Sequence, residues 1–233
     1  MSLRAIFFDA GNTLIRIDYA AIARALAARG VHTTPDDLMR AEWRARVRLD
    51  ADVFATGEIA STETRTTHSR YLAYVLEGVG VTEAAVVDAM DEWRRGYNRP
   101  LGLWTAPEPD AAPALTLARE SGLRTGVISN SNGMLKRILE RLDLLRLVDF
   151  ALDSQEEGVE KPQPAIFERA LARAGVTAGE AAYVGDLYSI DVRGARRVGM
   201  TGVLLDPGMC WGERDCPCVP TVLDAVKRLL ACT

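Results

Sequence analysis

Four short segments of this chain carry residue types that can bind or transfer a charged group. An apolar run ends abruptly at Asp9, and a second apolar run ends at Ser129. Lys161 is one of three lysines in a chain rich in arginine, and Asp186 is followed five residues later by Asp191. Carboxylate, hydroxyl and ammonium groups can supply an oxygen nucleophile, ligands for a cation and positive charge for an anion.

The apolar runs that precede these residues alternate with amphipathic stretches. We expect strands at 5–8, 124–129, 148–152, 181–185 and 201–205, and helices at 110–121, 133–144, 164–174, 189–198 and 219–230. This alternation predicts an α/β fold with a Rossmann-like parallel sheet, covered by helices on both faces. The carboxyl ends of parallel strands share one edge of the sheet, where ligands bind. Each polar residue alone could close a turn or cap a helix, so their convergence at one edge is what favours a functional site.

The segment between the first two strands has a different pattern. Helical periodicity with capping residues predicts helices at 19–29, 34–49, 61–77 and 82–95, and no strand pattern interrupts residues 17–95. This block has the size of a small helical bundle inserted after the first strand. We therefore expect a core domain formed by residues 1–14 and 99–233, and an inserted helical domain at 15–98.

The composition excludes several classes of protein. The chain has 233 residues, of which 48% are hydrophobic and 26% charged, and its formal net charge is −4. These values are ordinary for a soluble domain, and the net charge gives no reason to expect a nucleic-acid partner. No apolar run approaches the ~20 residues that a membrane helix needs, and the N-terminal residues do not have the layout of a signal peptide. We expect a cytoplasmic protein.

Four cysteines are present, at positions 210, 216, 218 and 232. The spacing of the first three, C-x5-C-x-C, is not one of the usual zinc spacings. Free thiols in a surface loop, or an incidental disulfide, are the favoured interpretations.

Taken in order, the polar segments resemble the motifs of the haloacid dehalogenase-like hydrolase superfamily. The first motif is an Asp followed four residues later by Thr, as in Asp9-Ala10-Gly11-Asn12-Thr13. The second is a strand ending in Ser or Thr, here Ser129. The third is a lysine that often precedes Pro-x-Pro, as in Lys161-Pro162-Gln163-Pro164, and the fourth is Gly-Asp-x4-Asp, from Gly185 to Asp191. The resemblance covers the whole chain, and the inserted helical block corresponds to the family's helical cap domain.

The resemblance implies a role for each of these residues. Asp9 would attack phosphorus and form an aspartyl phosphate, and Ser129 and Asn130 would donate hydrogen bonds to the phosphate oxygens. Lys161 would pair with both the phosphate and Asp9. Magnesium suits an all-oxygen site, and its ligands would be Asp9, the backbone carbonyl of Gly11 and Asp186, with Asp191 supporting the site from behind. The expected partner is a small phosphorylated substrate.

The first motif departs from the family's pattern at one position. Most phosphatases of the family carry a second Asp two residues after the nucleophile, where it acts as general acid and base. This chain has Gly11 there, followed by Asn12, a residue that tolerates left-handed backbone. Loss of general acid–base catalysis typically costs on the order of 10² to 10⁴ in rate. The resemblance therefore implies a phosphatase that is slow or restricted to good leaving groups.

Two other functions stay open at this point. One is a phosphate-binding or regulatory protein on the same fold that does not turn over. The other is a 2-haloacid dehalogenase; these enzymes also lack the second Asp, but they typically replace the Gly-Asp pair found here at Gly185 and Asp186. A phosphonoacetaldehyde hydrolase is disfavoured because residues 15–95 contain no lysine to form a Schiff base. A sugar phosphomutase is disfavoured because it needs the second Asp.

Overall fold

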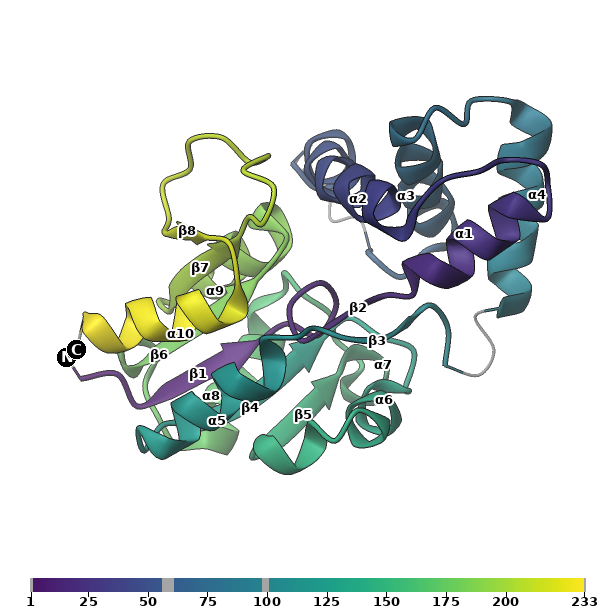
Figure 1. Ribbon diagram of the computed structural model, residues 1–233. Helices are drawn as coiled ribbons and strands as arrows, with labels where there is room; N and C mark the ends of the chain where they lie inside the picture. The colour runs from purple at the N-terminus through teal and green to yellow at the C-terminus, as the bar shows by residue number, and fades with distance from the viewer. Residues whose placement is uncertain (1, 56–60, 98–100, 233) are drawn as a thin grey trace. The chain divides into compact units, whose positions relative to one another are not determined.

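A computed structural model describes residues 2–55, 61–97 and 101–232 (Figure 1). The chain divides into two compact units. The first comprises Met1–Arg16 and Pro107–Thr233, and the second comprises Ile17–Ala106. The expected boundary between residues 98 and 99 lies outside the described residues.

A six-stranded sheet forms the centre of the first unit, with strand order β5-β4-β1-β6-β7-β8 and parallel pairing throughout. Its strands are β1 (Ala5–Phe8), β4 (Arg124–Ser129), β5 (Phe150–Asp153), β6 (Ala181–Gly185), β7 (Thr201–Leu205) and β8 (Cys218–Val219). All four residues of β1 are fully buried, as expected of a central strand covered on both faces. The predicted α/β fold with a parallel, Rossmann-like sheet is confirmed.

Helices cover both faces of this sheet. They are α5 (Ala111–Glu120), α6 (Leu135–Arg141), α7 (Ser154–Glu157), α8 (Pro164–Ala174), α9 (Arg193–Arg197) and α10 (Val222–Ala231). Phe7, Ile128 and Tyr183 point to the face covered by α8 and α9, where they pack against Phe167. Helices α5 and α10 contact each other on the opposite face (Figure 1). Side chains of a strand alternate between faces, so residues next to these three point toward α5 and α10.

Shorter turns complete this unit and modify some of the expected boundaries. Single turns of 3-10 helix occupy Leu145–Leu147 and Ala178–Glu180, and a π-helical turn at Tyr188–Val192 leads into α9. The helix expected at 133–144 is therefore shorter, and the one expected at 189–198 is split. The last helix begins at Val222, after the N-cap Thr221, and not at 219. Val219 instead belongs to the two-residue strand β8, which periodicity could not reveal.

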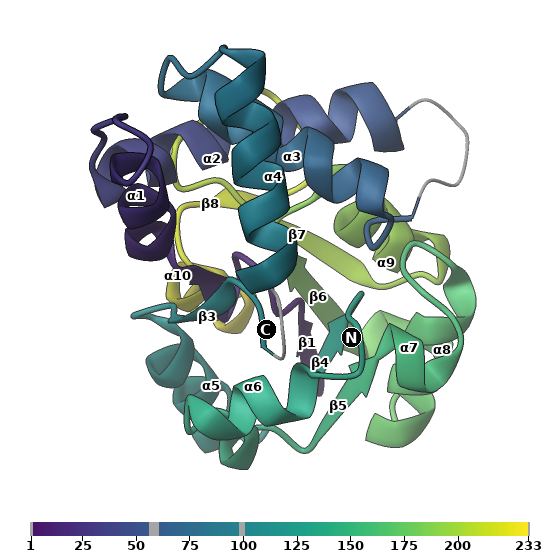
Figure 2. The ribbon, with the colours of Figure 1, turned by 90° about the vertical axis from the view of Figure 1, so that its right-hand side faces the viewer.

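The second unit is a bundle of four helices, α1 (Tyr19–Ala27), α2 (Pro35–Leu49), α3 (Arg65–Gly78) and α4 (Ala84–Tyr97), with a π-helical turn at Asp50–Phe54 (Figure 2). Each of α1, α2 and α3 begins at a capping side chain, Asp18, Thr34 and Thr64 respectively. Its interior also holds a polar cluster: Glu42 forms an ion pair with Arg46 and accepts hydrogen bonds from Tyr19 and Tyr71.

Two short strands were not expected. β2 (Ile15–Ile17) pairs with β3 (Trp104–Pro107) where the chain passes between the units. The expectation that no strand interrupts 17–95 is thus wrong at Ile17. Three residues are too few to show an alternating pattern, and Trp104–Pro107 ends in a proline, which favours a loop assignment. No helix within the described residues is long and apolar enough to cross a membrane.

Candidate active site

The chemistry-bearing residues of the first unit lie at the carboxyl edge of the sheet. Asp9 follows β1 directly, Ser129 is the last residue of β4, and Asp186 follows β6. β1 pairs with both β4 and β6, so these three strand ends are adjacent. After Asp9 the chain turns through Asn12, which adopts left-handed backbone with φ of 51°. Asn12 thereby takes a conformation that few residues with a side chain adopt readily.

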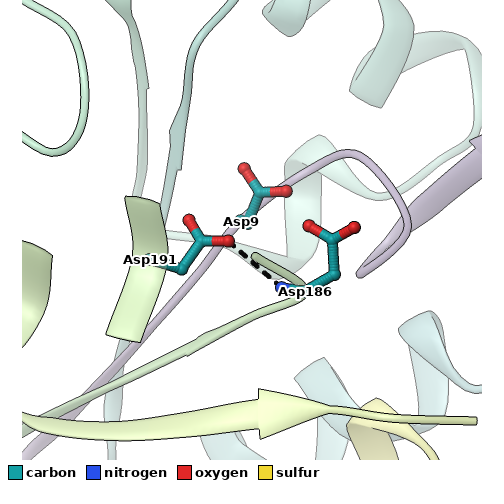
Figure 3. Close-up of side chains that lie close together, drawn as sticks. All are labelled: Asp9, Asp186 and Asp191. Carbon is teal, nitrogen blue, oxygen red and sulfur yellow. Dashed lines mark hydrogen bonds between the residues drawn. The ribbon is translucent and has the colours of Figure 1, made fainter. Parts of the chain in front are cut away.

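Three buried carboxylates meet at this edge. One oxygen from each of Asp9, Asp186 and Asp191 lies within 4.8 Å of the other two (Figure 3). Their exposed fractions are 7%, 4% and 1%. Like charges held this close and this deep are unfavourable without a compensating cation. An all-carboxylate donor set fits a hard divalent cation such as Mg²⁺, so the residues present fit the ion that the sequence implies.

Asp191 is fixed by its own hydrogen bonds. Its Oδ2 accepts from the backbone N–H group of Asp186 at 3.1 Å (Figure 3). The same oxygen accepts from the backbone N–H group of Leu187 at 2.9 Å. Its Oδ1 accepts from Lys161 Nζ at 2.7 Å. Gly185 makes this arrangement possible, because a Cβ atom there would overlap the Asp191 carboxylate. Asp191 thus shapes the turn that carries Asp186.

Lys161 forms ion pairs with two of the three carboxylates. Its Nζ lies 2.5 Å from Asp9 Oδ1 and 2.7 Å from Asp191 Oδ1, and the residue is 2% exposed. Burial alone would lower the pKa of Lys161, but the Asp191 and Asp9 carboxylates raise that pKa well above its ordinary value. For Asp9 the balance differs: burial raises its pKa to about 6, against the opposing effect of the Lys161 ammonium.

Two residues of this site were missed in the sequence. Lys161 Nζ donates a third hydrogen bond, of 2.9 Å, to the hydroxyl of Tyr183 in β6. Asn12 Nδ2 donates to Asp186 Oδ2 at 3.0 Å. Burial raises the pKa of Tyr183 well above its ordinary value, so the hydroxyl keeps its hydrogen. The sequence did contain one signal for Tyr183, since it is the only residue with a polar side chain in the otherwise small and aliphatic run 181–185.

A model of the haloacid dehalogenase-like hydrolases matches residues 3–199. The chain belongs to this family. It is 30% identical over 212 residues to the mouse haloacid dehalogenase-like hydrolase domain-containing protein 3, covering 88% of this chain and 82% of that protein. It is also 30% identical over 217 residues to the glyceraldehyde 3-phosphate phosphatase of Methanopyrus kandleri, covering 88% and 85% of the two chains.

Solved structures of the family share the fold. The crystal structure of a 2-haloacid dehalogenase from Pseudomonas syringae pv. tomato aligns over 98% of both chains, with a TM-score of 0.56 and 27% identity. This haloacid dehalogenase-like hydrolase is therefore similar along its length both to a protein named as a phosphatase and to one named as a dehalogenase. Overall similarity does not separate these two activities, so the residues at the site are the basis for choosing between them.

Hydrogen bonds connect the second motif of this haloacid dehalogenase-like hydrolase, at Ser129 and Asn130, with the third motif, at Lys161. Asn130 Oδ1 accepts from the backbone N–H of Lys161 at 2.8 Å, and Asn130 Nδ2 donates to the Lys161 carbonyl at 3.0 Å. Ser129 Oγ donates to the Asn130 carbonyl at 3.2 Å. These bonds place Lys161 relative to the end of β4. Phosphate binding by Ser129 and Asn130, and metal binding by the Gly11 carbonyl, stay predictions.

No candidate metal cluster among the described residues of this haloacid dehalogenase-like hydrolase includes a cysteine. All four are free thiols. Among the described residues, the only group of three or more acidic, histidine or cysteine side chains close enough to share an ion is Asp9, Asp186 and Asp191. The interpretation of positions 210–218 as free thiols is confirmed.

Proposed function

We propose that this chain is a magnesium-dependent phosphatase of small phosphorylated metabolites that works through an aspartyl phosphate on Asp9. The observation that carries this proposal is the cluster of Asp9, Asp186 and Asp191 with Lys161 bridging two of the three carboxylates. Such a site combines an oxygen nucleophile with positive charge on one side and cation-binding oxygens on the other. Phosphoryl transfer depends mainly on this kind of positioning and charge neutralisation.

The reaction divides into two displacements at phosphorus. An oxygen of Asp9 attacks the phosphorus atom, the bond from phosphorus to the ester oxygen breaks, and the alcohol leaves with a proton taken from solvent. Water then attacks the same phosphorus atom, the bond to Asp9 breaks, and inorganic phosphate leaves while the Asp9 carboxylate is restored. A magnesium ion held by Asp9, Asp186 and the Gly11 carbonyl would neutralise phosphate oxygens and so allow one anion to attack another.

The donor set favours a phosphatase over a dehalogenase. Asp186 lies beside the nucleophile and accepts a hydrogen bond from Asn12, which orients its carboxylate. A second carboxylate at this position can bind a cation that neutralises the oxygens of a phosphate group. Attack on the carbon atom of a haloacid does not need such a cation. The similarity to a protein named glyceraldehyde 3-phosphate phosphatase supports a small sugar phosphate as the substrate class.

Gly11 favours a second candidate function, a phosphate-binding or regulatory protein without turnover. Glycine at this position offers no side chain that could protonate the leaving alcohol or activate water. The two candidates share the site and differ in whether the phosphate ester is cleaved. Binding of phosphate with magnesium is therefore expected of both, and turnover only of the phosphatase.

The test is a panel of phosphorylated metabolites, together with p-nitrophenyl phosphate, assayed with magnesium and with a chelator. We expect hydrolysis of at least one ester that needs magnesium and falls below detection in Asp9→Asn, because the amide is a poor nucleophile. Asp143→Asn is the matched control: Asp143 is exposed, and its φ of 59° is one that asparagine accepts. Hydrolysis unchanged in Asp9→Asn would rule out the proposal, and magnesium-dependent binding without hydrolysis would favour the second candidate.

A further inference from the structure

Tyr183 lies in the buried core, and its hydroxyl contacts the candidate site at Lys161. It is fully buried in β6, opposite Phe7 of β1 in the parallel register. Its ring packs edge-on against Phe167 of α8, with ring centroids 5.2 Å apart. Two separate elements therefore fix the ring before its hydroxyl makes any contact. A side chain held in this way can position a more flexible neighbour.

The direction of the Tyr183 hydroxyl group follows from its two partners. The oxygen lies 2.9 Å from the carbonyl oxygen of Ile128 and 2.9 Å from Lys161 Nζ. A carbonyl oxygen can only accept, so the single hydroxyl hydrogen points to Ile128. The lone pairs then face Lys161 and accept one of its N–H groups. Because Ile128 precedes Ser129 in β4, the hydroxyl connects the end of that strand with the lysine.

The Lys161 ammonium has three N–H groups, and three acceptors surround it. Asp9 Oδ1 lies at 2.5 Å, Asp191 Oδ1 at 2.7 Å and Tyr183 Oη at 2.9 Å. Two of these acceptors are carboxylates, which would repel each other without the charge between them. The third is neutral and rigidly held. It fixes the rotation of the ammonium, so that the other two N–H groups point at the carboxylates.

We propose that Tyr183 is a positioning residue, which holds the Lys161 ammonium between Asp9 and Asp191 and so orients the Asp9 carboxylate for attack. In this arrangement Lys161 acts on the nucleophile and its supporting carboxylate. The sequence had implied that Lys161 also binds the phosphate itself. The two roles have different consequences for kinetics, because a contact with the bound phosphate lowers KM, whereas orientation of the nucleophile raises kcat.

The structural part of this proposal can be tested without turnover. The chain has three lysines, of which Lys136 and Lys227 are exposed at the surface and Lys161 is buried. With ¹⁵N-labelled lysine, we expect one ammonium signal protected from hydrogen exchange at neutral pH, and its loss in Lys161→Arg. In Tyr183→Phe, exchange of that signal should be at least about tenfold faster, because one acceptor is gone. No protected signal in the wild type would overturn the proposal, whether or not the protein is a phosphatase.

The kinetic part rests on the proposed phosphatase function. With an alkyl phosphate and magnesium, the poor leaving group makes the first displacement limit kcat, so Tyr183→Phe should lower kcat by about tenfold and change KM less than about twofold. The control is Tyr71→Phe, which removes a buried hydroxyl bound to Glu42 in the second unit and should leave kcat unchanged. An unchanged kcat in Tyr183→Phe, or a raised KM with an unchanged kcat, would overturn the positioning role. A wild type without turnover would reject the phosphatase function and leave the positioning role standing. If Tyr183→Phe does not fold, the ammonium signal of Lys161 in the wild type decides: without protection from hydrogen exchange, the positioning role is rejected.

Discussion

At the residue scale, the main feature of the site is that three buried carboxylates lie close together. Asp9, Asp186 and Asp191 are all buried, and Lys161 forms ion pairs with two of them, Asp9 and Asp191. Burial raises the pKa of Asp9 to about 6, with a further contribution from the Asp191 carboxylate and against the opposing effect of the Lys161 ammonium. A divalent cation would reduce the repulsion among the three carboxylates, which is why we infer that magnesium is part of the working site.

Gly11→Asp should raise turnover. An aspartate at this position could protonate the leaving alcohol and then activate water, so the gain should be largest for alkyl phosphates, whose leaving groups are poor. We expect an increase of at least about tenfold in kcat for such esters, within the usual contribution of general acid–base catalysis. Gly11→Asn is the matched control, with a side chain of the same size that cannot transfer the proton. Equal rates in the two variants would contradict this explanation of slow turnover.

The sequence predicted which residues lie at the carboxyl edge of the sheet better than it predicted the contacts that they make there. Asp9, Ser129 and Asp186 could be located because each stands at the carboxyl end of an apolar run, and strand ends of a parallel sheet converge. The contacts of Asn12 and Tyr183 depend on side-chain direction and on which strands are neighbours. Neither property is contained in the local pattern of a single sequence.

At the element scale, the turn after β6 determines the geometry. The π-helical turn Tyr188–Val192 brings Asp191 back under the turn, where its carboxylate accepts from the backbone of Asp186 and Leu187. This close return is possible only because Gly185 has no side chain. The spacing Gly-Asp-x4-Asp therefore has a mechanical reason: the glycine makes room for the second aspartate, and the second aspartate holds the first.

Gly185→Ala tests this reading of the turn. The added methyl group would displace the Asp191 carboxylate, and with it Lys161 and Asp186. We expect magnesium binding, measured by calorimetry, to weaken by at least about tenfold, together with a lower melting temperature. Gly96→Ala is the control, because Gly96 lies in α4 with open space around it and alanine favours a helix. Magnesium binding in Gly185→Ala equal to that of the wild type would show that the glycine is not needed.

Elements with a clear period were predicted well, and short ones were not. β4, β6, β7 and α8 have the expected bounds. β2, β3 and β8 have only two to four residues, and their existence depends on pairing with a strand distant in sequence. The π-helical turns at Asp50–Phe54 and Tyr188–Val192 were also missed, because a single wider turn leaves the apolar period of a helix almost unchanged.

At the scale of the whole molecule, the proposed chemistry resides in one unit. Asp9, Ser129, Lys161, Asp186 and Asp191 all belong to the unit formed by Met1–Arg16 and Pro107–Thr233. The chain leaves this unit once, after Arg16, and returns once, at Pro107. The helical unit is thus an insertion between the first motif and the other three. Its identification as the family's helical cap domain stays a prediction.

The central claim is that Asp9 receives the phosphoryl group. The most direct measurement mixes the protein with magnesium and p-nitrophenyl phosphate, quenches the reaction in acid, and locates any phosphoryl group by mass spectrometry of the peptides. Because Gly11 leaves the second displacement without general base catalysis, the phosphorylated form should accumulate. We predict one added phosphoryl group on the peptide that contains Asp9, and none in Asp9→Asn. Hydrolysis without a phosphoryl group on Asp9, or with the group on another residue, would contradict the account.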